Sequence, residues 1–252
     1  MRVVRNIGYV KKRRRAGKLI VFSGIFMLLG AWFITLLYPP LFLISTIGLA
    51  VGFIFFNGGM QQMSRWSRKP RTDEILDTEL NRLNDRFALI HYPEIHGRRP
   101  DHALIMPNGI LVITPREVPG AMSVHGKVWR RKGNPLGRLF VMGGPQLGNP
   151  TIENQEQVKT LNAWLESKDL SAGDIHGSIV FIAENVEVEI VDPEVPVLHI
   201  SELADYIRQI SAGDVTLTGR NRDAIIAALS GGDEVETNAA APSRPRKKVR
   251  AA

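Results

Sequence analysis

The chain of 252 residues has no cysteine, which excludes disulfide-stapled secreted folds and zinc or iron–sulfur centres held by thiolates. Charge is missing from one long stretch, because no Lys, Arg, Asp or Glu occurs over residues 19–64. The mean hydropathy of −0.05 is nevertheless that of an ordinary soluble protein. This mean value therefore combines an apolar part of the chain with a polar part.

Acidic residues are absent from three basic segments. Residues 1–18, 65–71 and 242–252 carry eight, four and five Lys or Arg respectively, and the rest of the chain carries 15 basic and 25 acidic residues. The net charge of +7 therefore belongs to these segments. A nucleic-acid-binding protein is expected to carry its basic patch on the folded domain, whereas here the basic residues border apolar segments or form a terminal tail.

Two mainly apolar stretches, 19–38 and 41–60, are each twenty residues long. At ~1.5 Å per residue, each matches the ~30 Å hydrocarbon core of a bilayer as a helix. Pro39 and Pro40 lie between them and end the first helix, which permits a tight reversal. The stretches are too long for a cleaved signal peptide, and no small-residue cleavage site follows the first. The sequence predicts a transmembrane helical hairpin over 19–63, preceded by a basic N-terminal segment, 1–18.

The basic residues on both sides of the hairpin predict its orientation, because Lys and Arg stay on the cytoplasmic side of a membrane. We expect a cell-membrane protein with two spans, both termini and the globular part being cytoplasmic. The basic flanks also predict weak contact with anionic lipid. The tail at 242–250 is suited to bind lipid or nucleic acid, and the alternative is that it only solubilises the chain.

Gly48 and Gly52 form a G-x-x-x-G pattern in the second apolar stretch, which allows two helix backbones to approach closely. One interpretation is a homodimer through these glycines. The other is packing against the first helix of the same chain. The sequence names no protein partner.

After residue 71 the pattern is that of an α/β domain, predicted over 72–230 and followed by a disordered basic tail, 231–252. Leu76, Leu80, Leu83 and Phe87 recur at helical spacing and predict a helix over 73–87. Asn108-Gly109 between two apolar runs predicts a hairpin. The remaining predicted elements are strands at 87–92, 102–106, 110–114, 121–125, 127–131, 176–184, 186–190 and 195–200, helices from Asn149-Pro150 to 167, from Ser201 to 210 and over 222–229, and a loop at 133–148 around the apolar run 139–142.

One stretch, residues 98–116, reads RRPDHALIMPNGILVITPR and is followed by Gly126-x-x-Trp129. It resembles the nuclease-related domain (NERD) family, in which an Asp-His opens a hairpin with a Pro-Asn-Gly type turn and the next apolar strand ends in Glu-x-Lys. The resemblance covers about residues 72–210. It implies a restriction-endonuclease-like fold, a mixed sheet with flanking helices.

The resemblance also implies a set of site residues. Asp101 matches the family's aspartate and Glu74 its first-helix acid, and these carboxylates would hold Mg²⁺ or Mn²⁺, hard cations that prefer oxygen ligands. Thr114 and Arg116 stand where the family has Glu and Lys. Threonine is a weak neutral ligand, and arginine keeps the charge but cannot act as a base. Glu117 replaces the missing glutamate only if a bulge intervenes, because successive strand residues face opposite sides.

Two functions remain open from these residues. The first is a membrane-tethered, catalytically degenerate nuclease-like module that binds or scaffolds and needs no cofactor. The second is an active Mg²⁺-dependent phosphodiesterase acting on DNA or RNA through Asp101, Glu74, Glu117 and Arg116. The six histidines lack the paired helical spacing of metal ligands, so we expect them at polar strand or turn positions.

Overall fold

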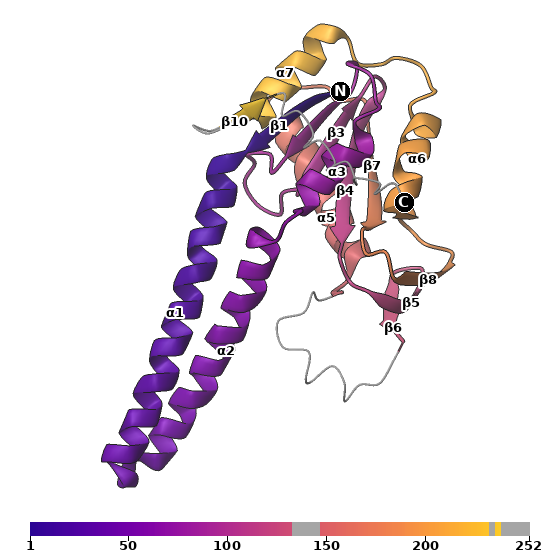
Figure 1. Cartoon of the computed structure of the whole chain (residues 1–252). Coiled ribbons are helices and arrows are strands. Elements are labelled where there is room, and N and C mark those ends of the chain that lie inside the picture. Colours follow the sequence, from indigo (N-terminus) through magenta and orange to yellow (C-terminus); the bar gives the residue numbers. More distant parts are fainter. Residues whose placement is uncertain (133–146, 232–234, 238–252) are drawn as a thin grey trace, which may run out of the picture.

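The computed structural model describes residues 1–132, 147–231 and 235–237, and consists of a long helical hairpin and an α/β domain (Figure 1). The helices are α1 (Ile7–Leu37), α2 (Phe42–Ser67), α3 (Thr72–Leu80), α5 (Pro150–Glu166), α6 (Leu203–Ile210) and α7 (Gly219–Leu229), with 3₁₀ turns at Pro39–Leu41 and Ile200–Glu202. The strands are β1 (Arg2–Asn6), β2 (Ala88–His91), β3 (His102–Met106), β4 (Gly109–Arg116), β5 (Gly120–His125), β6 (Val128–Arg131), β7 (Asp174–Phe181), β8 (Val186–Val191), β9 (Val197–His199) and β10 (Val235–Thr237). The predicted run at 139–142 lies outside the described residues, as does the tail predicted to be disordered except for residue 231 and β10, which pairs with β1 as a strand.

The main sheet has the order β10-β1-β2-β3-β4-β7-β9 and is mixed. The pairs β1–β2, β4–β7 and β7–β9 are parallel, while β2–β3 and β3–β4 are antiparallel. A smaller sheet has the order β6-β5-β8, in which β5 and β6 follow β4 along the chain and β8 follows β7. The predicted class, a mixed sheet with flanking helices joined to two long apolar helices, is confirmed.

Alternation along the strands divides the apolar residues between two faces of the main sheet. Leu89, Leu104 and Leu111 pack with α3 and α6 on one face. Ile90, Ile105 and Val112 pack with α5 and α7 on the other. The domain is therefore a three-layer α/β/α structure, as the period-two patterns of β2, β3 and β4 require.

The first helix of the domain is shorter than predicted. α3 ends at Leu80, although Leu83 and Phe87 are buried in the same core cluster as Leu76. The turn after Leu80 places these side chains on the core as a continued helix would, so the apolar spacing alone could not locate the end. Similarly, the predicted helix start at Ser201 falls within a 3₁₀ turn, and α6 begins two residues later, at Leu203.

The predicted hairpin between β3 and β4 is present, but its turn is Pro107-Asn108, because Gly109 already pairs with Met106. Gly109 is needed for close approach rather than for a left-handed turn. A Cβ atom there would lie 2.0 Å from the carbonyl oxygen of Asp174, on the neighbouring strand β7.

Residues 2–6 form strand β1, which sequence analysis missed. β1 lies parallel to β2, and its Val3 and Val4 are buried. The chain then passes directly into α1, where the Asn6 side chain caps the helix by accepting from the Tyr9 backbone N–H at 2.8 Å. Five residues ahead of a basic run give too short a pattern to indicate a strand, yet the domain is incomplete without them.

A buried arginine joins the start of the hairpin to its end. The Arg5 guanidinium, on β1, pairs through Nε with Asp73 at 2.7 Å and through a terminal nitrogen with Asp77. Both acids are buried on α3. The strand before the hairpin is thus tied to the helix after it.

The two hairpin helices pack through residues spaced seven apart. Val10, Gly17, Gly24 and Ala31 are buried on α1, and Ser45, Gly52, Gly59 and Trp66 on α2. Such a repeat keeps one face of each helix on its partner, and the glycines bring the backbones close. The outward side chains are apolar and exposed, for example Phe26 at 78% and Leu43 at 76%.

Both hairpin helices are long and apolar enough to cross a membrane, as predicted. Gly48 and Gly52 both face α1, where added Cβ atoms would meet Ala31 and Leu28 at 3.1 Å. They are therefore used within the chain. Dimerisation through them stays a prediction.

Adjacent glycines of α2 offer a matched test of this packing. A Cβ at Gly59 would lie 2.6 Å from the Val21 backbone nitrogen, whereas one at Gly58 meets nothing within 4 Å. We expect Gly59→Ala to lower the free energy of unfolding in detergent by about 1–3 kcal/mol, as overpacking does. Gly58→Ala should be neutral or stabilise by up to about 1 kcal/mol through helix propensity. Equal stabilities of the two variants would contradict the observed interface.

Arg5 and Arg2, on the same strand, provide a second test. Arg5 is 6% exposed and pairs with two buried acids, so Arg5→Gln should cost about 3–5 kcal/mol of stability, the usual cost of breaking a buried pair. Arg2 is exposed, and Arg2→Gln should change stability by less than about 0.5 kcal/mol. Denaturant unfolding followed by tryptophan fluorescence measures both, and a tolerated Arg5→Gln would refute the structural role of the pair.

Candidate functional site at the junction of hairpin and domain

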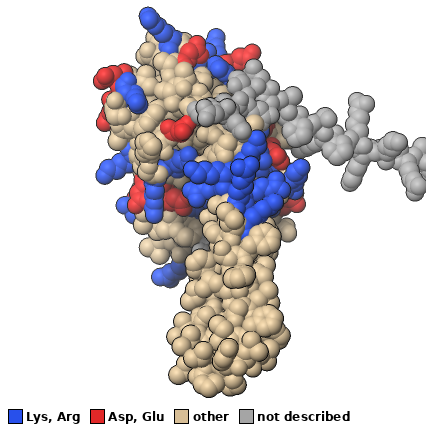
Figure 2. Space-filling model, turned by 90° about the vertical axis from the view of Figure 1, so that its left-hand side faces the viewer, with Lys and Arg blue, Asp and Glu red and all other residues tan. Residues whose placement is uncertain are grey.

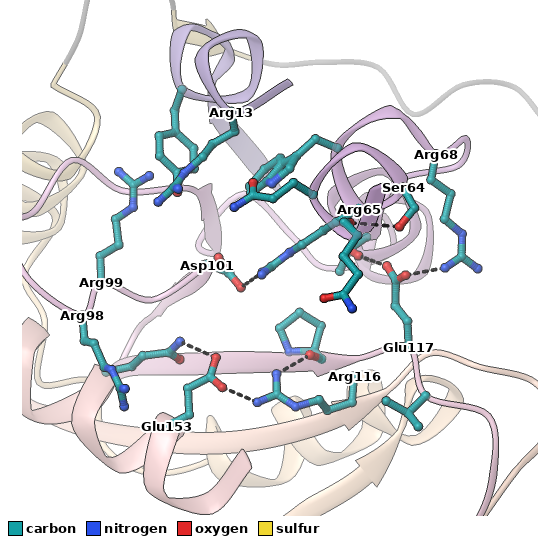
Figure 3. Close-up of a pocket in the computed structure, with 18 of the residues that line it drawn as sticks. Arg13, Ser64, Arg65, Arg68, Arg98, Arg99, Asp101, Arg116, Glu117 and Glu153 are labelled. Carbon is teal, nitrogen blue, oxygen red and sulfur yellow. Dashed lines mark hydrogen bonds and ion pairs between the residues drawn. The ribbon is translucent and has the colours of Figure 1, made fainter. Parts of the chain in front are cut away.

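A cavity of about 750 Å³ lies where the hairpin meets the domain. Figure 3 shows its side chains pointing inward from both parts. The hairpin contributes Tyr9, Arg13, Gln61, Gln62, Ser64, Arg65, Trp66 and Arg68, and the domain contributes Thr72, Gly97, Arg98, Arg99, Asp101, Pro115, Arg116, Glu117, Val118, Glu153 and Gln157. Three of the four predicted site residues, Asp101, Arg116 and Glu117, line this cavity.

Asp101, at the start of β3, forms an ion pair with Arg65 of α2, drawn at the centre of Figure 3. Its side chain is 16% exposed. Burial by itself would raise the pKa of this carboxyl, but the positive charge of Arg65, joined by those of Arg116 and Arg99, holds the pKa below its usual value. Asp101 is therefore an ionised group that already has a cationic partner.

Thr114 and Arg116, which replace the family's Glu and Lys, lie on the same face of β4 and contact α5. The Thr114 hydroxyl is buried, donates to Gln157 at 2.7 Å and accepts from Asn154 at 2.9 Å. Arg116 pairs with Glu153. The end of β4 thus meets two side-chain amides and one carboxylate of α5, and the Thr114 hydroxyl is hydrogen-bonded to both amides.

Pro115 marks the end of pairing between β4 and β3. β4 lies between β3 and β7, but its last partner on β3 is His102, which pairs with Ile113. Pro115 therefore lies past the point where β4 pairs with β3. Its missing amide hydrogen removes no hydrogen bond between these two strands. This explains how a central strand accommodates it.

Glu117 and Glu74 lie apart from the Thr114 face. Glu117 pairs with Arg68 and accepts a hydrogen bond from the Thr72 hydroxyl. Glu74 caps its own helix by accepting from the Arg71 backbone N–H at 3.1 Å. The structure thus brings Asp101 and Glu117 to one cavity, each with its own arginine, and leaves Glu74 in the first turn of α3.

Within residues 1–132 and 147–231, no three His, Asp or Glu side chains are grouped so that they could hold a metal ion. The carboxylates of the cavity are each paired with an arginine from a different element. A divalent cation would need several of these oxygens on one point, so the residues present do not fit such a site.

Several cavity residues were not foreseen from the sequence. Glu153 and Gln157 lie one helical turn apart on α5, and only the packing of α5 on β4 shows that they meet Thr114 and Arg116. Arg65 and Arg68 were interpreted as basic residues that orient the hairpin. No local sequence pattern indicates that they also reach the acids of the domain.

Behind Asp101, a buried polar chain runs through the sheet. His91 and His102 are cross-strand partners, and their Nδ1 atoms lie 2.7 Å apart. Because an ionised carboxylate only accepts, His91 Nε2 donates to Asp77 at 2.8 Å. Burial lowers the pKa of His102 to about 3, so its ring is neutral at physiological pH. These histidines are strand residues, as expected, but sequence spacing could not show that they meet.

Aromatic residues fix the hairpin to the domain beside the cavity. The rings of Tyr9, Trp66 and Tyr92 pack with centroids 5.1–5.7 Å apart. The Arg99 guanidinium lies over the Tyr9 ring, 3.3 Å from its centroid. The ends of both helices therefore form one wall of the cavity and are held there by packing.

Fold and site together define a mixed α/β domain with a nuclease-type strand end, carried on an apolar helical hairpin. Residues 71–182 match the family model described as "Nuclease-related domain", NERD. This match agrees with the resemblance found in the sequence. β1 and the hairpin lie outside the matched range, although β1 belongs to the same sheet. No curated protein and no solved structure matches the chain.

Proposed function

We propose that the protein is a membrane-anchored binding or scaffolding module built on a catalytically degenerate nuclease-related domain. The hairpin spans the cell membrane twice, and both termini and the globular domain are cytoplasmic. In this arrangement, the nuclease-type strand end faces the membrane surface. It binds a ligand there and does not cleave nucleic acid.

The observation that carries this proposal is the pairing of the acids with arginines. Arg65 and Arg68, from the last turn of the hairpin and the residue after it, pair with Asp101 and Glu117, and Arg116 pairs with Glu153. A hydrolytic metal centre needs carboxylates free to share a cation and a water. Here, the membrane helix neutralises the carboxylates that such a centre would use.

The charge distribution supports the orientation. Lys and Arg side chains gather where the apolar stalk meets the globular body (Figure 2), and residues 11–15 are all exposed. Cations at this level suit the cytoplasmic face of a membrane, where anionic lipids are found. The domain lies on the same side as this basic belt.

An active phosphodiesterase remains the second candidate. The observation in its favour is that Asp101, Arg116 and Glu117 line one cavity together with a fourth charged group, Glu153. For this activity, a metal ion would have to replace Arg65 as the partner of Asp101. Adding a metal ion therefore distinguishes the phosphodiesterase from the binding module.

A cleavage assay on the full chain in detergent, with plasmid DNA, single-stranded DNA and RNA plus Mg²⁺ or Mn²⁺, tests the proposal. We expect no cleavage above that of Asp101→Ala, because each cavity carboxylate already has a cationic partner. Asp214→Ala removes an exposed carboxylate and controls for general effects. Cleavage that Asp101→Ala abolishes and Asp214→Ala retains would establish the phosphodiesterase instead.

The orientation can be tested by labelling, because the natural chain has no cysteine. A Tyr38→Cys variant, at the hairpin turn where the side chain is 62% exposed, should react with a membrane-impermeant maleimide in intact cells. A Lys168→Cys variant, at an exposed position of the domain, should react only after permeabilisation. The opposite pattern would invert the proposed topology, and labelling of both in intact cells would exclude a spanning hairpin.

A further inference from the structure

The cavity at the junction has an excess of positive charge. Its lining includes the six arginines 13, 65, 68, 98, 99 and 116, against the three acids 101, 117 and 153. Four of the arginines have carboxylate partners: Arg65, Arg68 and Arg116 pair within the cavity, and Arg98 pairs with Glu156. The remaining two, Arg13 and Arg99, carry the excess.

Arg13 and Arg99 have no carboxylate partner among the described residues and instead share one tyrosine. Arg13 Nε donates to the Tyr9 hydroxyl at 2.7 Å, and Arg99 stacks on the ring of the same residue. Figure 3 shows both arginines at the same side of the cavity. One terminal nitrogen of Arg99 donates to the Pro93 carbonyl oxygen at 3.5 Å. Stacking does not use the other N–H groups of a guanidinium, and these match the oxygens of a phosphate.

Two guanidinium nitrogens at this cavity are buried without a hydrogen-bond partner in the part of the chain that the structure describes, one terminal nitrogen of Arg99 and Nε of Arg116. A buried donor without a partner costs free energy. Burial also lowers the pKa of Arg99, because its charge is poorly solvated. An anion in the cavity would relieve both costs.

The position of the cavity relative to the apolar stretches indicates the source of the anion. Residues 61–68 follow the stretch 41–60 directly and, at ~1.5 Å per residue, extend about 10 Å beyond it. The headgroup layer of a bilayer begins at the edge of the hydrocarbon core and is ~5–8 Å thick on each side. The part of the cavity wall formed by Gln61 and Arg65 therefore lies at headgroup depth if the hairpin spans the membrane, and Arg68 lies just beyond it.

We propose that this cavity binds the phosphate headgroup of one anionic phospholipid, with Arg13 and Arg99 as its phosphate partners. The inference rests on the membrane anchoring in the proposed function and names the ligand of that module. A nucleic acid is disfavoured, because only Arg13 and Arg99 lack a carboxylate partner among the described residues of the cavity, too few for the many phosphates of a polyanion, whereas a single phosphate can contact these two alone.

Native mass spectrometry of the full chain in mild detergent tests the site, with phosphatidylglycerol and phosphatidylcholine of identical acyl chains as probes. We expect one retained phosphatidylglycerol, bound at least tenfold more tightly than phosphatidylcholine. Arg99→Gln and Arg13→Gln should each weaken it about tenfold, roughly the loss of one charge-assisted hydrogen bond. Arg13 is exposed, so its variant also tests the site if Arg99→Gln loosens the junction.

Arg14→Gln is the matched control, because Arg14 is an exposed neighbour on α1 that does not line the cavity. Its affinity for phosphatidylglycerol should stay within about twofold of the natural chain. A loss as large as that of Arg99→Gln, or no preference for phosphatidylglycerol over phosphatidylcholine, would overturn the proposal, since general attraction to the basic belt would then account for binding.

Competition separates a lipid from soluble anions. Millimolar inorganic phosphate and a short single-stranded DNA should both fail to displace the bound lipid. Displacement by phosphate would assign the site to a soluble anion, and displacement by DNA would assign it to nucleic acid, and either result overturns the lipid. Nucleic-acid cleavage would overturn the proposed function but leave an arginine-dependent lipid preference standing, so the two failures are distinguishable.

Discussion

The buried pairing of Arg5 with Asp73 and Asp77 is the constraint on which the rest of the structure depends. Arg5 precedes the hairpin and the two acids follow it, so the pair closes a long excursion of the chain out of the domain and back. An arginine and two carboxylates are tolerated in an interior only when they pair. The strand before the hairpin and the helix after it must therefore fold together.

This closure makes the hairpin a structural part of the domain. β1 enters the sheet beside β2, α3 packs on one face of the same sheet, and the ring cluster of Tyr9, Trp66 and Tyr92 fills the space between the two helix ends and β2. An excised domain beginning at residue 72 would lack β1 and would leave Asp73 and Asp77 without Arg5. Experiments on this protein should therefore use the full chain.

The chemistry of the strand end follows from the same geometry. Because α2 ends against the domain, Arg65 and Arg68 reach Asp101 and Glu117, and these two acids become ion-pair partners of arginines at the end of a long apolar helix. Thr114 stands where the resemblance has a glutamate, and its hydroxyl is hydrogen-bonded to the Gln157 and Asn154 amides of α5. The acids that make the motif recognisable are thus present, each with an arginine partner.

Much of the fold was predictable because its signals are local. Period-two alternation located β2, β3 and β4, and the Asn149-Pro150 cap located the start of α5. Twenty-residue apolar stretches located the hairpin. The end of α3 was not predictable, because the turn after Leu80 places Leu83 in the core just as a continued helix would. The strand β1 was not predictable, because five residues are too few to show a pattern. The cavity was predictable only in part, because Asp101, Arg116 and Glu117 stood out in the sequence, whereas Arg65, Glu153 and Gln157 did not.

The sequence by itself determined the helices of membrane-spanning length, the α/β class and the nuclease-related motif with Thr114 and Arg116 in place of Glu-x-Lys. Each of these features depends on residues that are close together along the chain. Only the tertiary structure decided which charges meet. Arg5 finds acids some seventy residues away, Arg65 finds Asp101, and Arg13 and Arg99 come to one tyrosine. Pairings of this kind depend on where the sheet and the hairpin place side chains that are far apart in the sequence, and no local sequence pattern indicates which of them come together.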